Sequence, residues 1–130
     1  MKSFTVSDVV AMNPCGWDKP DDGKNYSPIR VAKLFAGRDT ITIMDALEMD
    51  ISDADKIWFS CRAMTHRQRV MFAGLCALEC EPNYRAKYPD DHRVLDAANS
   101  TITFAENPNE ENADAAAAAA ARWADAAAAA

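Results

Sequence analysis

The chain of 130 residues contains only four glycines. Few turns can therefore use a backbone with positive φ, and loops must be short or built on proline and asparagine. Alanine, in contrast, occupies twenty-six positions, fourteen of them between residues 113 and 130. Because alanine has the highest helix propensity and is poor in strands, the composition predicts an all-α protein.

Long hydrophobic runs are also absent. No apolar stretch approaches the roughly 20 residues that a helix needs to cross a bilayer. The first residues, Met1-Lys2-Ser3, are not followed by the hydrophobic region of a secretory leader. We therefore expect no membrane association, a cytoplasmic location and reduced cysteines.

Positive charge is scarce, since 14 Lys and Arg side chains face 20 Asp and Glu, for a net charge of −6. Binding to a nucleic-acid backbone needs an excess of positive charge, so we do not expect direct nucleic-acid binding. An acidic surface suits a basic partner protein instead.

Helix-start signals predict six or seven helices in one compact bundle, a single domain over residues 1–130. Capping residues stand at Thr5, Ser27, Thr42, Ser52 and Thr65. A loop rich in Gly, Pro and Asp is expected over 13–27, with Trp17 as the one large apolar side chain available to anchor it.

Residues 66–81 are expected to form the central helix. The segment from Val70 to Leu78 holds no polar residue, and a helix that is apolar on all sides must be surrounded. Pro82 is expected to end or kink it. The alanine-rich segment 108–130 predicts a last helix, in which Trp123 is the one large side chain and the small side chains allow close packing.

Cysteine and histidine raise the question of a metal or a nucleophile. Cys76 and Cys80 lie four residues apart on one expected helix. Their candidate co-ligands are Cys61, His66 and His92. The spacing is no zinc-finger pattern, and buried core cysteines explain these residues better. Cys15 matches no cysteine-nucleophile signature. We therefore predict no metal ligand, no cofactor and no catalytic residue.

Four carboxylates surround the start of the last helix: Glu106, Glu110, Glu111 and Asp114. Acidic side chains at this position complement the helix dipole. Together they also offer a charged face that competes with a basic or nucleic-acid-binding surface. We take them as the candidate partner-binding residues.

Several segments share a pattern with known proteins. The chain reads TVSDVVAMNPC over 5–15, VAKLFAGR over 31–38, TIMDALEMDISDADKIW over 42–58 and CEPNYRAKYPDDHR over 80–93, ahead of the alanine-rich tail. In these segments, which are spread over nearly its whole length, it resembles a family of small all-helical immunity proteins of bacteria and their phages. The residues that carry the family pattern most specifically are Pro14, Cys15, Asp55, Trp58, Tyr88, Pro89, Asp90 and Arg93.

The resemblance implies a non-enzymatic protein that binds and neutralises a partner protein in the bacterial cytoplasm. That partner would be a toxin, or a host defence protein such as a CRISPR effector if the chain serves a phage. Two alternatives stay open. One is a metal-binding or redox regulator that uses Cys and His, and the other is a self-associating helical module that forms a homodimer.

Overall fold

The computed structural model describes residues 1–129, without the side chains of residues 126, 127 and 129. Seven helices and two short strands make up the secondary structure of these residues, which confirms the all-α expectation. Contacts within the chain divide it into two compact units, unit 1 over residues 1–63 and unit 2 from residue 64 onward. A single domain over the whole chain remains a prediction.

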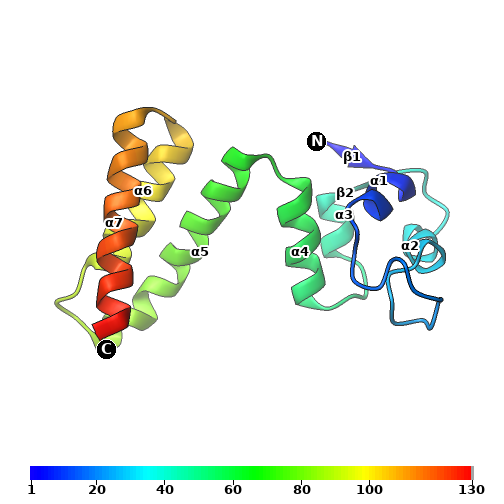
Figure 1. Cartoon of the computed structure of the whole chain (residues 1–130), viewed down its shortest axis with the longest axis horizontal. Coiled ribbons are helices and arrows are strands. Elements are labelled where there is room, and N and C mark those ends of the chain that lie inside the picture. The colour runs from blue at the N-terminus through cyan, green and yellow to red at the C-terminus, as the bar shows by residue number, and fades with distance from the viewer. Residues whose placement is uncertain (130) are drawn as a thin grey trace. The chain divides into compact units, whose positions relative to one another are not determined.

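Unit 1 consists of short helices around a small antiparallel ladder (Figure 1). Its elements are β1 (Ser3–Phe4), α1 (Val6–Ala11), α2 (Pro28–Phe35), β2 (Ile41–Thr42), α3 (Ile43–Leu47) and α4 (Asp53–Ala63). The ladder, which the sequence patterns did not predict, pairs Ser3 with Thr42 and Phe4 with Ile41.

The predicted helix starts are confirmed by their hydrogen bonds. Thr5 and Thr42 each form a capping box, in which an aspartate three residues later, Asp8 or Asp45, accepts a hydrogen bond from the cap backbone N–H. The hydroxyl of Ser27 accepts a hydrogen bond from a backbone N–H at the start of α2. Each cap partners backbone groups that the first turn of a helix leaves unpaired.

The core of unit 1 forms where the ladder meets α4. Phe4 and Phe59 meet edge to face, with ring centroids 5.5 Å apart, which is a favourable geometry for aromatic pairs. The buried apolar residues of this core are Phe4, Val9, Val31, Phe35, Ile41, Ala46, Phe59 and Ala63.

The loop before α2 is not anchored by Trp17, which is 41% exposed, so that expectation was wrong. The loop is held by its own hydrogen bonds. Asp22 accepts two from backbone N–H groups that follow it, and the N–H of Tyr26 donates to the carbonyl of Cys15 over 3.0 Å. Tyr26, at the end of the loop, is the aromatic residue that packs against the core.

Unit 2 is built from three helices: α5 (His66–Lys87), α6 (Arg93–Glu106) and α7 (Glu110–Ala129). The middle position belongs to α6, which contacts both α5 and α7. Figure 1 shows α6 and α7 side by side and joined at one end. In α7 the packing uses small side chains, since Ala119 is buried. Trp123 of α7 meets the ring of Tyr84, with centroids 5.1 Å apart.

Helix α5 is longer and less covered than the sequence predicts. It continues through Pro82 to Lys87. Pro82 has no N–H to donate to the carbonyl of Leu78, but both residues are exposed, so water can hydrogen-bond to that carbonyl. Within its unit α5 buries the face of Gly74 and Glu81, while Leu75 and Leu78 remain exposed.

The expectation of buried core cysteines was wrong for Cys76 and Cys80, both of which are exposed, and Cys15 is exposed as well. Cys76 and Cys80 lie on the side of α5 opposite the buried positions 74 and 81, because α6 covers one side of this helix only. None of the four cysteines, all of which the structure describes, forms a disulfide.

The close approach of α5 and α6 depends on Gly74. A Cβ atom placed there would lie 2.8 Å from Cγ1 of Ile102 and 3.4 Å from the carbonyl oxygen of Ala98. The facing positions Ala98 and Ala105 are 1% exposed. Small residues on both helices therefore let the two backbones come together.

We expect Gly74→Ala to lower the free energy of unfolding of unit 2 by about 1 kcal/mol. The gain in helix propensity is about 1 kcal/mol, whereas overpacking of a filled site costs about 1–3 kcal/mol. Urea unfolding followed by circular dichroism measures the difference. The reverse change at an exposed neighbour, Ala73→Gly, calibrates the propensity. A variant stabilised by the full propensity gain would show that Ile102 does not lie this close.

Candidate functional site

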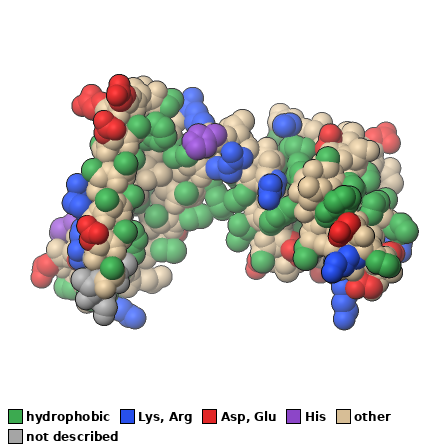
Figure 2. All heavy atoms as spheres, viewed as in Figure 1, with side chains coloured by type: hydrophobic (Ala, Val, Ile, Leu, Met, Phe, Trp, Pro, Cys, Tyr) green, Lys and Arg blue, Asp and Glu red, His purple; other side chains and the backbone are tan. Residues whose placement is uncertain are grey.

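The four predicted carboxylates come together at one end of unit 2. Glu106 is the last residue of α6, and the other three lie in the first turns of α7, across a short connection. All four are exposed, and none forms an ion pair with another residue that the structure describes. Figure 2 shows acidic side chains gathered at this end of α7. We call Glu106, Glu110, Glu111 and Asp114 the acidic end.

The acidic end rests on a defined framework. Asn109 caps α7, because its side-chain oxygen accepts a hydrogen bond from the N–H of Asn112 over 2.8 Å. The amide of Asn112 donates in turn to the carbonyl of Asn107 over 2.8 Å. Arg67 of α5 donates to the last carbonyls of α6, at Ala105 and Glu106. The turn that carries the carboxylates is thereby fixed on both sides.

The residues that carry the family pattern fall into two groups in space. Tyr88, Pro89, Asp90 and Arg93 line an open concavity at the connection between α5 and α6. There Asp91 accepts hydrogen bonds from the hydroxyl of Tyr84 (2.7 Å) and the guanidinium of Arg93 (2.6 Å), and these lower the pKa of Asp91. This cluster fixes the connection between the two helices.

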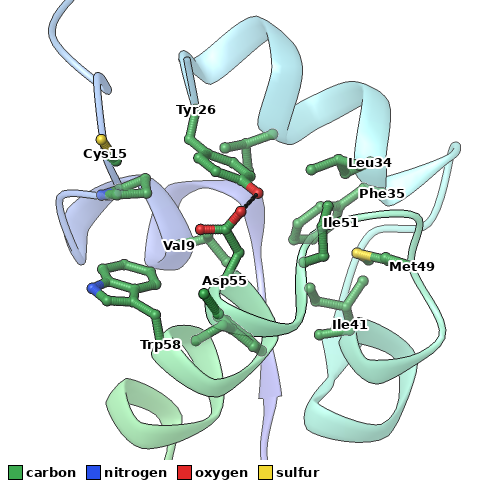
Figure 3. Close-up of a pocket in the computed structure, with 15 residues that line it drawn as sticks. Val9, Cys15, Tyr26, Leu34, Phe35, Ile41, Met49, Ile51, Asp55 and Trp58 are labelled. Carbon is green, nitrogen blue, oxygen red and sulfur yellow. Dashed lines mark hydrogen bonds between the residues drawn. The ribbon is translucent and has the colours of Figure 1, made fainter. Parts of the chain in front are cut away.

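The other group, Pro14, Cys15, Asp55 and Trp58, lines a cavity of about 280 Å³ inside unit 1 (Figure 3). Its walls come from the loop before α2, from α2 itself, from the segment around α3 and from the first turns of α4. The lining is almost wholly apolar. Its further members are Val9, Tyr26, Val31, Leu34, Phe35, Ile41, Ala46, Met49, Ile51, Ala54 and Phe59.

One polar pair interrupts this apolar lining. The hydroxyl of Tyr26 donates to Oδ2 of Asp55 over 2.6 Å, and the hydroxyl of Ser52 donates to the same oxygen over 2.7 Å. The guanidinium of Arg30 lies 4.2 Å from the ring centroid of Tyr26. Asp55 therefore binds Ser52, the residue directly before α4, and also lines the cavity.

Tyr26 and Asp55 shift each other's pKa. Burial, together with the hydrogen bond to Asp55, raises the pKa of Tyr26 to about 12. The hydrogen bonds from Tyr26 and Ser52 lower the pKa of Asp55 below its usual value near 3.8. At neutral pH the pair is therefore a carboxylate and a neutral phenol, which suits binding better than proton transfer.

Sequence reasoning missed Tyr26 and the role of Ser52 in holding Asp55 toward the cavity. A signal for Tyr26 was present. It directly precedes the cap Ser27, and Val31 stands four residues after that cap, which is the spacing of a hydrophobic staple. No local pattern pairs Tyr26 with Asp55, because 29 positions separate them.

Among the residues that the structure describes, no three His, Cys, Asp or Glu side chains come close enough to hold a metal ion. Within the same residues, no helix has the length and apolarity to span a membrane. No family model, curated protein or solved structure matches the chain. The resemblance to immunity proteins therefore remains a prediction.

We expect Tyr26→Phe to lower the free energy of unfolding of unit 1 by about 1.5 kcal/mol at pH 7, because a hydrogen bond to a carboxylate is lost. The pKa of Asp55 should rise toward 3.8. A carboxyl with a lowered pKa stabilises the fold above about pH 4, and this contribution disappears as the pH falls through its folded pKa. The difference between the variant and the wild type should therefore shrink at pH 2–3.

Urea titrations at pH 7 and pH 2.5, followed by the NMR signals of unit 1, measure this difference. Tyr88→Phe is the matched control, because Tyr88 is 48% exposed and its hydroxyl forms no hydrogen bond within the described residues. An equal loss of stability at both pH values would contradict a role for the ionised carboxylate.

Proposed function

We propose that this protein is a non-enzymatic inhibitor that binds and neutralises a partner protein through the acidic end. The observation that carries the proposal is the gathering of four exposed carboxylates at one turn, with no ion pair to another described residue. Charges that are not neutralised within their own chain are available to a basic surface on another protein.

Electrostatic complementarity supports the choice of a basic partner. The whole chain carries a net charge of −6, so its long-range field also favours approach to a positively charged protein. Carboxylates held on a turn between two helices can occupy a surface that otherwise binds nucleic-acid phosphates. A toxin nuclease or a nucleic-acid-dependent defence enzyme has a surface of that kind.

The test is a binding measurement with a charge-reversed acidic end. A tagged protein captures its partner from the bacterial host, and the purified pair is then measured by calorimetry. We expect the variant Glu106→Lys, Glu110→Lys, Glu111→Lys to lose at least about tenfold in affinity, because like charges would then face each other. The wild-type affinity should also fall as the salt concentration rises.

A matched control makes the same change of charge elsewhere. Asp39, Glu48 and Asp50 are exposed residues of unit 1 whose side chains form no ion pair or hydrogen bond with described residues. The variant with these three residues changed to lysine should keep the affinity. Equal losses in both variants would assign the effect to net charge alone. Full binding by the charge-reversed acidic end would overturn the proposal.

Inhibition itself is a separate readout. The purified protein should suppress the toxic or enzymatic activity of its partner at a one-to-one ratio, and the charge-reversed variant should fail to do so at the same concentration. Binding without any loss of the partner's activity would contradict the inhibitor function.

A further inference from the structure

The cavity of unit 1 takes no part in the proposed inhibition, which uses unit 2. Its volume of about 280 Å³ is well above the roughly 150 Å³ of an engineered apolar cavity that holds benzene. All of its lining residues lie between Val9 and Phe59, so unit 1 alone forms the site. The space is open to solvent on one side, where the lining residues Cys15 and Ala54 are exposed. Tight packing normally fills apolar space of this size.

The shape and lining of the cavity suit an apolar molecule. Val31 and Phe35 of α2, both 2% exposed, form one side, and Trp58 of α4 contributes an indole ring from another. Figure 3 shows Tyr26 and Trp58 on either side of Asp55. An aromatic ring with a short aliphatic arm fits walls of this kind.

The polar side chains of the cavity restrict which apolar molecule can bind. Oδ2 of Asp55, a half-buried residue, accepts two hydrogen bonds, whereas Oδ1 accepts none from the residues that the structure describes. In Figure 3 this second oxygen points away from Tyr26. The Tyr26 hydroxyl donates its one hydrogen to Asp55, so toward a ligand it can act only as a hydrogen-bond acceptor. The two side chains therefore favour a ligand that donates hydrogen bonds.

The charge of the lining residues also favours a ligand that donates hydrogen bonds. Asp55 is the one lining residue with a formal charge at neutral pH, and no Lys, Arg or His side chain lines the cavity. Arg30 lies over the Tyr26 ring and donates to the carbonyl of Lys24, and its charge also helps to lower the pKa of Asp55. A carboxylate within apolar walls binds a protonated amine more strongly than it binds a neutral donor.

We propose that this cavity binds a small arylalkyl amine, whose ring lies among the apolar side chains and whose ammonium group donates a hydrogen bond to Oδ1 of Asp55. The site is distinct from the acidic end in residues, in chemistry and in location in the chain. It gives the protein a small-molecule ligand in addition to its proposed protein partner.

The experiment titrates the full chain with 2-phenylethylamine, and in parallel with 2-phenylethanol, by isothermal calorimetry and by NMR of the protein methyl groups. The amine should bind more tightly than the alcohol of the same shape. Methyl signals of Val31, Ala46 and Ile51 should shift, because these residues line the cavity. Shifts confined to unit 2, or no binding of the amine, would overturn the proposal.

Asp55→Asn tests the carboxylate without changing its size. We expect a loss of about tenfold to a hundredfold in affinity for the amine, as for other hydrogen bonds to a charged group, and little change for the alcohol. Asp53→Asn is the matched control, since it removes the same charge from an exposed residue of the same helix. Equal binding of the amine by wild type and Asp55→Asn would contradict the assigned ammonium site.

A second variant covers the case in which Asp55→Asn fails to fold. Ala46 is 2% exposed and lines the cavity, so Ala46→Leu should fill part of the space and abolish binding of both probes. Unchanged affinity in a folded Ala46→Leu protein would overturn the proposal. The charge-reversed acidic end should bind the amine as wild type does, so failure of the protein inhibitor and failure of this site can be told apart.

Discussion

The hydrogen bond between the Tyr26 hydroxyl and Asp55 joins two segments that lie 29 positions apart in the chain. On one side it holds the end of a long loop, and on the other it holds the first turn of α4, where Ser52 binds the same carboxylate oxygen. Because phenol and carboxylate belong to different walls, their bond also fixes the distance between those walls. The loop, the start of α4 and the cavity of unit 1 therefore depend on one contact.

The helices of this chain could be predicted because the signals that start them are local. Thr5, Ser27, Thr42 and Thr65 each cap a helix at the position that the sequence indicates, and every cap is settled by residues within three positions. Burial could not be read in the same way. Whether an apolar stretch is covered depends on neighbours far away in the chain. In unit 2, α5 packs against α6 along the side of Gly74 and Glu81, with Trp123 of α7 against Tyr84. Cys76 and Cys80 are exposed for this reason.

The two candidate sites also differ in how far local sequence could predict them. The acidic end was predictable, because its four residues lie within nine positions and meet across one short turn. The cavity was not, because Pro14 and Cys15 join Asp55 and Trp58 only through the tertiary fold. The two sites also use different forces. The binding proposed at the acidic end would depend on charge and weaken with salt, whereas the binding proposed in the cavity would also use the removal of apolar surface from water.

The alanine content of α7 has a consequence for how the acidic end is presented. Alanine has no side-chain rotamers to fix, so ordering this helix costs little side-chain conformational entropy. The helix can thus form without large side chains over most of its length, and Ala119 and Trp123 are among its contacts to the rest of unit 2. A scaffold that is already ordered has little freedom left to lose on association. The alanines of α7 thereby lower the entropic cost of holding charges in place at its first turn.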